Sequence, residues 1–234
     1  MNIIYFGFNS FNQHKRGIEN VIQFQSRAAK FENIYYVHWA ERTKIYKYGK
    51  FICISIKKCW YWPIILNFVI VKIYKKRKPI IHSHNYLFSF FSIINTDIFT
   101  VHDGLYYLKK AKKCKNLIVF KAIEYITYLR CKKVQFISNY TKEQSLYPRN
   151  REYIIVYNTS YLEPLIKNSC FKFKQEDIFN ILIVRSIEER ARIDLIFEVA
   201  KKINDPNIQF TIVGKGPLLE FYIKKKLKMK IIRI

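Results

Sequence analysis

The sequence has few acidic residues, no cysteine pair at metal-ligand spacing and no apolar run long enough to cross a bilayer. Its 17 aspartates and glutamates stand against 42 lysines and arginines, which gives a formal net charge of +25. The five cysteines are odd in number and include no C-x-x-C pair, which argues against a disulfide framework and a structural zinc site. A reducing cytoplasm therefore fits this chain best.

The most apolar run, at residues 60–71, is shorter than the ~20 residues that a membrane-spanning helix needs. Aromatic residues stand at one end of this run and basic residues flank both ends, which is typical of a helix that lies in a membrane interface. A buried core helix is the alternative. No signal peptide is expected, because residues 2–6 have the pattern of a first strand. We expect a cytoplasmic protein, peripheral at the inner face of the plasma membrane if the apolar helix binds lipid.

The excess of positive charge has three interpretations. It can bind nucleic acid, or it can hold the protein on an anionic membrane surface, where each nearby basic residue contributes ~1 kcal/mol. The third interpretation is base composition, because Lys, Ile, Asn, Tyr and Phe are abundant and have A/T-rich codons. No RNP, zinc-finger or helix-turn-helix signature is present. An anionic membrane surface is therefore an expected partner, and nucleic acid is not.

Short β-rich segments alternate with helical patterns along the chain, which predicts parallel α/β units. Strands are expected at residues 2–8, 33–38, 51–56, 79–83, 97–101, 134–137, 154–157, 180–184 and 209–213. Helical spacing of apolar residues is seen at 17–30, 115–131 and 188–203. The sequence contains no internal repeat and no low-complexity tract.

A polar, aperiodic segment around residues 163–177 predicts a domain boundary. We expect a complete Rossmann-like N-terminal domain at 1–165, a linker at 166–176 and a second Rossmann-like domain at 177–234. Only two βα units fall in the second domain. They leave sheet edges and much of one sheet face bare, so we expect this domain to be incomplete.

Several polar residues follow expected strands of the first domain. In the first βα turn, Gly17 allows close approach of the backbone to a ligand, and Glu19 lies in the first helical turn. A carboxylate there is usually a helix-dipole partner or a cap, with a functional role as the alternative. His82 and His84 alternate at a strand end and should point the same way. They lack an acidic or cysteine partner at metal-ligand spacing.

Further along, His102 and Asp103 end another strand, at the carboxyl edge of the sheet where open α/β folds bind ligands. A functional role and a structural role remain open for this histidine. Ser138 stands in N-cap position, where its hydroxyl is expected to cap a helix. Asn158 follows one more strand at the same edge.

In the second domain, Arg185, Arg190 and Arg192 stand between a strand and a helix, an arrangement suited to clamping a diphosphate. A solvated basic loop is the alternative. Gly214 and Gly216 form a Gly-x-Gly turn after the next strand. Such a turn is typical of a phosphate-binding loop but is not specific on its own.

Seven segments in chain order resemble the family 4 glycosyltransferases of the GT-B fold: RGIENVI, IIHSHN, FTVHD, ISNYTKE, VYNTS, VRSIEERARIDLIFEVA and FTIVGKGP. The resemblance covers nearly the whole chain. It implies two Rossmann-like domains facing across a cleft, an acceptor on the first and a nucleotide-sugar donor on the second. It further implies retention of anomeric configuration, no cofactor and no obligatory metal. Bacterial members commonly build surface polysaccharide and lipopolysaccharide, so a lipid-linked or polysaccharide acceptor is expected.

The resemblance also assigns roles by position. It implies that His102 lies beside the transferred sugar, where it would act in catalysis. His84, Asp103, Ser138 and Asn158 would lie along the edge of the cleft. The residues implied to bind the donor are Gly17, Glu19, Arg185, Arg190, Arg192, Gly214 and Gly216.

The chain departs from the family pattern in four places. Arg16 replaces the first of two loop glycines, and Val184 replaces the glycine before the second-domain arginine. Ala191 and Arg192 replace a lysine-glycine pair, so Arg190 or Arg192 would supply that cation. The two glutamates of the family, at E-x7-E spacing, belong beyond the glycine turn and are absent. We therefore expect a C-terminally truncated glycosyltransferase, and both an active and an inactive chain stay open.

Two other classes stay open. A non-catalytic membrane-associated remnant, or a half-subunit completed by a separate chain, shares every motif above. A basic nucleic-acid-binding protein is the third alternative.

Overall fold

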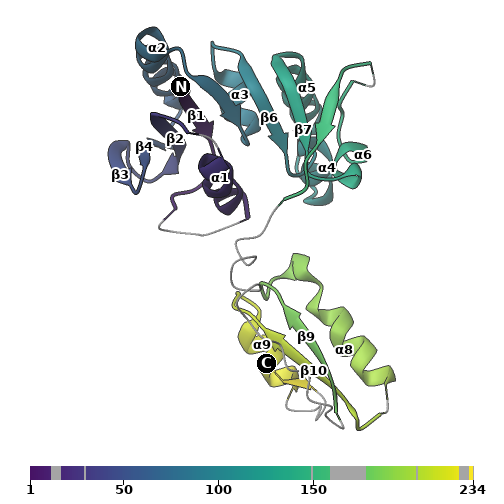
Figure 1. Ribbon diagram of the computed structural model, residues 1–234. Coiled ribbons are helices and arrows are strands. Elements are labelled where there is room, and N and C mark those ends of the chain that lie inside the picture. Colours follow the sequence, from purple (N-terminus) through teal and green to yellow (C-terminus); the bar gives the residue numbers. More distant parts are fainter. Residues whose placement is uncertain are drawn as a thin grey trace. The chain divides into compact units, whose positions relative to one another are not determined.

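The computed structural model describes residues 1–11, 17–28, 30–148, 150–158, 178–203, 205–226 and 232–233. The chain separates into two compact units, Met1–Ile166 and Lys167–Ile234. Each unit has a sheet and helices of its own (Figure 1). The predicted linker at 166–176 lies outside the described residues.

Strands and helices alternate through unit 1. In chain order they are β1 (Asn2–Phe6), α1 (Gly17–Ala28), β2 (Asn33–Ala40), β3 (Lys44–Tyr48), β4 (Phe51–Lys57), α2 (Trp62–Arg77), β5 (Ile80–Ser83), α3 (Tyr86–Phe91), β6 (Thr96–Val101), α4 (Leu105–Ala111), α5 (Leu117–Leu129), β7 (Cys131–Phe136), α6 (Asn139–Glu143) and β8 (Tyr153–Ile155).

These strands form one eight-stranded sheet in the order β3-β4-β2-β1-β5-β6-β7-β8. Neighbouring strands are parallel except β3, which runs antiparallel to β4. The strand order reverses direction at β1. Strands β2, β3 and β4 lie on one side of β1, and strands β5 to β8 lie on the other. Open sheets of this kind bind ligands at the carboxyl ends of their strands.

The alternation of side chains along β1 explains how both faces of the sheet are covered. Ile3 and Tyr5 pack in a cluster with Ile22 of α1, whereas Ile4 and Phe6 pack on the other face in a cluster that includes side chains of α2 and α3. Figure 1 accordingly shows α1 on the opposite side of the sheet from α3. A strand buried on both faces reads as a continuous apolar run, which is why the sequence predicted this one.

Strand β3 was not predicted from the sequence. It is an edge strand whose lysines are exposed, and its tight connection to β4 contains Gly49 at a φ of 54°. Lysine and twisted or short edges are common devices that keep an edge strand from pairing with other chains. A strand of this kind has neither the length nor the apolar run by which the buried strands were recognised.

Unit 2 contains β9 (Phe179–Val184), a 3₁₀ turn (Glu189–Ala191), α8 (Ile193–Lys202), β10 (Ile208–Val213), α9 (Leu219–Lys226) and β11 (Ile232–Arg233). Its described strands form a parallel sheet in the order β11-β10-β9. The core lies between this sheet and the helices, around side chains that include Phe197, Phe210, Ile212 and Tyr222. Phe197 and Tyr222 stack with ring centroids 5.2 Å apart.

The helix expected at 188–203 is divided at Arg192. This residue adopts the left-handed conformation, with φ 52° and ψ 43°, and it separates the 3₁₀ turn from α8. A residue other than glycine in this region is strained, commonly by 1–2 kcal/mol. The family pattern has glycine at this position, which accommodates the same conformation without that strain.

Candidate functional site

A cavity of about 210 Å³ opens at the carboxyl edge of the unit 1 sheet, where β1, β5 and β6 end side by side. Its apolar wall comes from Phe8, Ile18, Leu87, Leu105, Leu108 and Phe120. Its polar groups come from His84, Asn85, Tyr86, His102, Asp103 and Lys109. A largely apolar cavity with a few convergent polar groups is the usual form of a small-molecule site. The structure therefore brings together His84, His102 and Asp103, as their places at strand ends predicted.

Asn85 fixes the position of His84, and the sequence reasoning did not single it out. Its side-chain oxygen accepts hydrogen bonds from the backbone N–H groups of Leu87 and Phe88, at 3.0 and 3.3 Å, and so caps α3. Its amide nitrogen donates to the carbonyl of Gly7 at 3.0 Å. The end of β1 is thereby tied to the end of β5. An asparagine before the apolar run YLFSFF is a recognisable N-cap signal.

Three histidine rings lie in a row, and two of them, His84 and His102, line the cavity. The ring centroids of His82 and His84 are 4.7 Å apart, and those of His84 and His102 are 5.2 Å apart. The expectation that His82 and His84 point the same way is confirmed. The Nε2 atom of His82 hydrogen-bonds to the Thr100 hydroxyl at 2.7 Å. Within the described residues, no group of three or more His, Cys, Asp or Glu side chains is placed to hold a metal ion.

Burial keeps these imidazoles uncharged. It lowers the pKa of His82 to about 3 and that of His102 to about 4, and it lowers the pKa of His84 well below its ordinary value of 6.5. The Nδ1 atom of His84 lies 2.9 Å from Nε2 of His102. Because one hydrogen fits between these atoms, both neutral rings carry their protons on Nδ1 or both carry them on Nε2. The remaining nitrogen of His102 thus meets a ligand as a donor in the first state and as an acceptor in the second.

A buried carboxylate organises the side of the cavity formed by α4. Glu124 of α5 accepts hydrogen bonds from the backbone N–H of Tyr106 at 2.6 Å, from that of Leu146 at 2.9 Å and from the Tyr128 hydroxyl at 3.1 Å. Burial raises its pKa above the ordinary value. Sequence reasoning missed this residue. The available signal was an isolated carboxylate on an otherwise apolar and basic helix.

Glu19 and Gly17 lie at the start of α1. Glu19 is buried, and its Oε1 atom accepts hydrogen bonds from the backbone N–H of Asn9 at 3.0 Å and from the Asn9 side chain at 3.4 Å. This carboxylate therefore holds the turn after β1. A Cβ atom at Gly17 would meet nothing within 4 Å. The space around Gly17 thus does not itself require glycine, and a donor-binding role for either residue stays a prediction.

Two other predicted residues lie further along the same edge. The Ser138 hydroxyl accepts a hydrogen bond from the backbone N–H of Thr141 at 3.1 Å and caps α6, as expected. Asn158 is exposed beyond the end of β8. Neither residue is among those that line the cavity.

In unit 2, the structure brings Arg185 and the glycine turn together at the carboxyl ends of β9 and β10. The backbone N–H of Arg185 donates to the carbonyl of Val213 at 3.0 Å, and that of Ile187 donates to the carbonyl of Lys215 at 2.9 Å. Arg185 itself is exposed. A Cβ atom at Gly214 would lie 1.9 Å from the carbonyl oxygen of Arg185, and one at Gly216 would lie 2.1 Å from that of Ile187. Both glycines therefore allow the two loops to pack in contact.

This contact predicts that Gly216→Ala destabilises unit 2 by about 2–4 kcal/mol, because the obstructing atoms are backbone and cannot turn aside. Thermal unfolding followed by far-ultraviolet circular dichroism measures the effect. Gly17→Ala is the matched control, since its added methyl group has open space around it. Equal melting temperatures for the two variants would show that the loop contact is wrong.

The basic residues after β9 differ in their surroundings. The Arg192 guanidinium makes a two-pronged contact with the Asp194 carboxylate, at 3.0–3.1 Å, and lowers the pKa of that carboxyl. Binding a diphosphate through Arg192 would compete with this pair. The side chain of Arg190 lies outside the described part of the chain. Among the predicted cations of unit 2, Arg185 has an exposed side chain and forms no ion pair with any residue that the structure describes.

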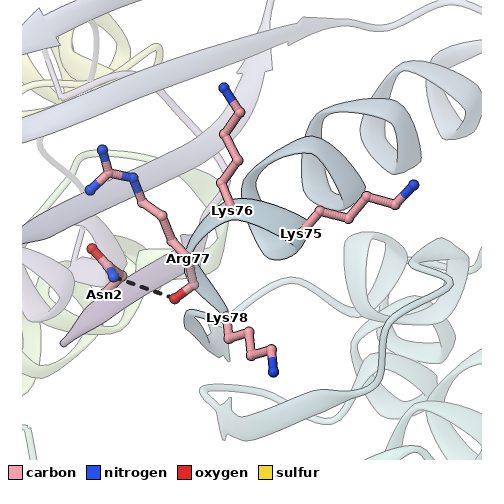
Figure 2. A pocket seen from close by; sticks show the side chains of 5 residues that line it. All are labelled: Asn2, Lys75, Lys76, Arg77 and Lys78. Carbon is pink, nitrogen blue, oxygen red and sulfur yellow. Dashed lines mark hydrogen bonds between the residues drawn. The ribbon is translucent and has the colours of Figure 1, made fainter.

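Helix α2 carries a second notable surface, away from the cavity. Its C-terminal end contributes Lys75, Lys76, Arg77 and Lys78 to an open hollow that also includes Asn2. Figure 2 shows these four side chains diverging from the helix end, with the Asn2 amide donating to the Arg77 carbonyl at 3.4 Å. Leu66 and Ile70 are buried against the sheet, so the helix has a core-facing side.

Across the residues that the structure describes, no helix is long and apolar enough to cross a membrane.

Comparison with known proteins identifies a fold. No protein-family model and no curated protein matches the sequence. Among solved structures, the chain is similar to the E. coli trehalose-6-phosphate protein bound with UDP-2-fluoro glucose, with a TM-score of 0.62 and 10% identity over 97% of this chain and 68% of that one. It is also similar to Anabaena HepE in complex with UDP and glucose, with a TM-score of 0.56 and 10% identity over 100% of this chain and 68% of that one.

These likenesses define the class of fold to which the chain belongs. It is an α/β protein with a GT-B-like fold, as predicted, and its parallel sheets are Rossmann-like. At 10% identity the likeness concerns the fold alone. Membership of glycosyltransferase family 4 stays a prediction.

Proposed function

We propose that this chain is a nucleotide-sugar-dependent glycosyltransferase whose unit 1 cavity binds sugar beside His102. The observation that carries the proposal is the cavity itself, which places His84, His102 and Asp103 at the carboxyl edge of a parallel sheet. The GT-B-like fold supports it, and so do the two neighbours, whose structures contain UDP with glucose or a fluoroglucose donor. The finer parts of the proposal are retention of configuration and a role in surface polysaccharide or lipopolysaccharide synthesis.

In the proposed reaction, the bond between the anomeric carbon and the donor diphosphate breaks, and a bond from that carbon to an acceptor hydroxyl oxygen forms. The hydroxyl proton leaves with the diphosphate. Negative charge develops on this leaving group, so a cation such as Arg185 would stabilise the transition state more than the ground state. His102 would orient the sugar through its free ring nitrogen. The proposed acceptor is lipid-linked or a polysaccharide, and an anionic membrane surface is proposed as a partner.

Binding of the donor can be tested without turnover. We expect UDP-glucose and GDP-sugars to bind the purified chain in a calorimetric titration, and Arg185→Ala to weaken binding about tenfold to a hundredfold, the range for loss of a hydrogen bond to a charged group. Lys201→Ala is the control, because this exposed lysine lies in the last turn of α8, at the other end of the helix. Equal affinity for the wild type and the Arg185 variant would contradict the assignment.

A further inference from the structure

Helix α2 presents large apolar side chains to solvent. Trp60, just before the helix, is 88% exposed, and Ile64 and Phe68 are 68% and 69% exposed. Residues spaced by four lie on one side of a helix, and this side is opposite to the buried Leu66 and Ile70. We call Trp60, Ile64 and Phe68 the α2 surface. Apolar side chains gathered in this way mark an interaction site more often than isolated ones do.

The end of α3 extends the α2 surface. The side chain of Asn67 donates to the carbonyl of Phe91 at 2.9 Å and accepts from the backbone N–H of Ile93 at 2.7 Å. Phe91 and Ile93 are themselves exposed. The Trp62 and Phe91 rings also meet, with centroids 5.0 Å apart. The apolar area therefore continues from one helix to the next on a fixed scaffold.

The charge around this surface has one sign. Between Glu41 and Asp97 the sequence contains eleven lysines and arginines and no acidic residue. Exposed lysines flank the α2 surface at both ends: Lys57 and Lys58 precede it, and the basic residues of the hollow in Figure 2 follow it. An occupant must accordingly be apolar where it meets the helix and negatively charged around that contact.

Three kinds of occupant can be compared on these grounds. A second copy of the chain would bring two sets of like charges together, which opposes self-association. Nucleic acid would satisfy the lysines but offers no apolar phase for Ile64 and Phe68. An anionic bilayer provides both parts, since acyl chains meet the apolar side and headgroups meet the lysines, with the aromatic residues at the boundary.

We propose that the α2 surface docks unit 1 on an anionic lipid bilayer, with the basic hollow at Asn2 and residues 75–78 meeting lipid headgroups. The helix lies in the interface and does not cross it. This inference deepens the partner named in the proposed function, but it does not depend on sugar transfer, because lipid binding is measured without a donor. If the chain bound lipid but not the donor, the proposed transferase function would be contradicted and the proposed docking surface would still hold.

The test is sedimentation of the full chain with vesicles of phosphatidylcholine, with and without phosphatidylglycerol. We expect binding to the anionic vesicles alone, weakened by added salt. Neutralising Lys75, Lys76 and Arg77 together by glutamine should weaken binding about a hundredfold, or about fivefold for each charge. The matched control neutralises three other lysines, Lys201, Lys202 and Lys215, and should leave binding nearly unchanged.

The apolar contribution needs its own variant. Ile64→Ser with Phe68→Ser is expected to weaken binding about tenfold or more, whereas Phe221→Ser, at an exposed aromatic position of α9, should not. Both sites are on the surface, so the variants should fold, and circular dichroism checks this. Trp60→Phe should remove most of the blue shift of tryptophan emission that vesicles induce.

Several outcomes would overturn the proposal. One is equal binding to neutral and anionic vesicles, and another is equal loss in the control variants. Tighter binding to DNA or RNA than to anionic vesicles, at the same salt concentration, would assign the basic surface to nucleic acid. A dimer in solution that Ile64→Ser and Phe68→Ser dissociate would assign the surface to self-association.

Discussion

Acidification from pH 7 to about pH 5 is expected to unfold unit 1 while unit 2 stays folded. The cause is a set of buried neutral histidines. Burial lowers the pKa of His38 and His84, that of His82 to about 3 and that of His102 to about 4, against an ordinary value of 6.5. Below pH 6.5 these histidines therefore bind protons in the unfolded chain but not in the folded chain, so the free energy of unfolding falls as pH falls. The loss accumulates most steeply between the unfolded and folded pKa values and is complete only below the folded ones.

The size of the effect follows from the number of protons. Well below pH 6.5, each buried neutral histidine lowers the free energy of unfolding by about 1.4 kcal/mol per pH unit. His82, His84 and His102 together therefore lower it by about 4 kcal/mol per pH unit. A domain is typically stable by only ~5–15 kcal/mol, so the loss of about 6 kcal/mol over the roughly 1.5 pH units between 6.5 and 5 is enough to unfold a domain of modest stability. Glu124 acts in the opposite direction, because its raised pKa makes the folded state bind a proton first. One carboxyl group offsets only part of the effect.

The chain contains its own controls for this measurement. All three tryptophans, Trp39, Trp60 and Trp62, lie in unit 1, so tryptophan emission during an acid titration reports on that unit alone. No histidine occurs after residue 102, so hydrogen exchange of amides in unit 2 should stay protected over the same range. Unchanged urea midpoints of unit 1 at pH 7 and pH 5 would contradict the assignment of these histidines as buried and neutral.

The sequence predicted the parallel core well because its signal is local. A strand covered on both faces must be apolar at consecutive positions, and Asn2–Phe6 shows this. Phe179–Val184 was found by the same kind of apolar run, although Phe179, Leu182 and Val184 are exposed in unit 2. Strand β3 carries lysines and is held mainly by pairing with β4, so its own residues did not reveal it. The break before α8 was missed for a different reason. It comes from the left-handed conformation of Arg192, a residue type that rarely adopts it.

The candidate site also has a part that the sequence predicted and a part that it did not. His84, His102 and Asp103 were predicted because topology alone brings the carboxyl ends of β5 and β6 together. The contacts between these residues were not predictable, since they depend on side-chain directions. The two supporting residues, Asn85 and Glu124, act on backbone groups of other segments. Glu124 contacts Leu146, which is 22 positions away, and no spacing rule within a helix indicates such a partner.

Glu124→Ala is expected to destabilise unit 1 by about 3–5 kcal/mol. The substitution leaves the N–H groups of Tyr106 and Leu146 and the Tyr128 hydroxyl without their acceptor, in a place that water does not reach freely. An unsatisfied buried polar group costs about 1–3 kcal/mol, and neighbouring groups relax in part, so the sum falls short of three full penalties. Glu124→Gln keeps the shape and one acceptor oxygen and should cost about half as much.

Chemical denaturation followed by tryptophan emission measures this loss in unit 1. The control is Glu143→Ala, because Glu143 is exposed in α6 and its removal should change stability by about 0.5 kcal/mol or less. Glu124→Ala also tests whether the buried core supports the cavity. Glu124 holds the backbone at the start of α4, the helix that supplies Leu105 and Leu108 to the cavity wall. If Glu124→Ala unfolded no more readily than Glu143→Ala, α4 would not depend on the buried carboxylate, and the cavity would have to be held by the histidine side alone.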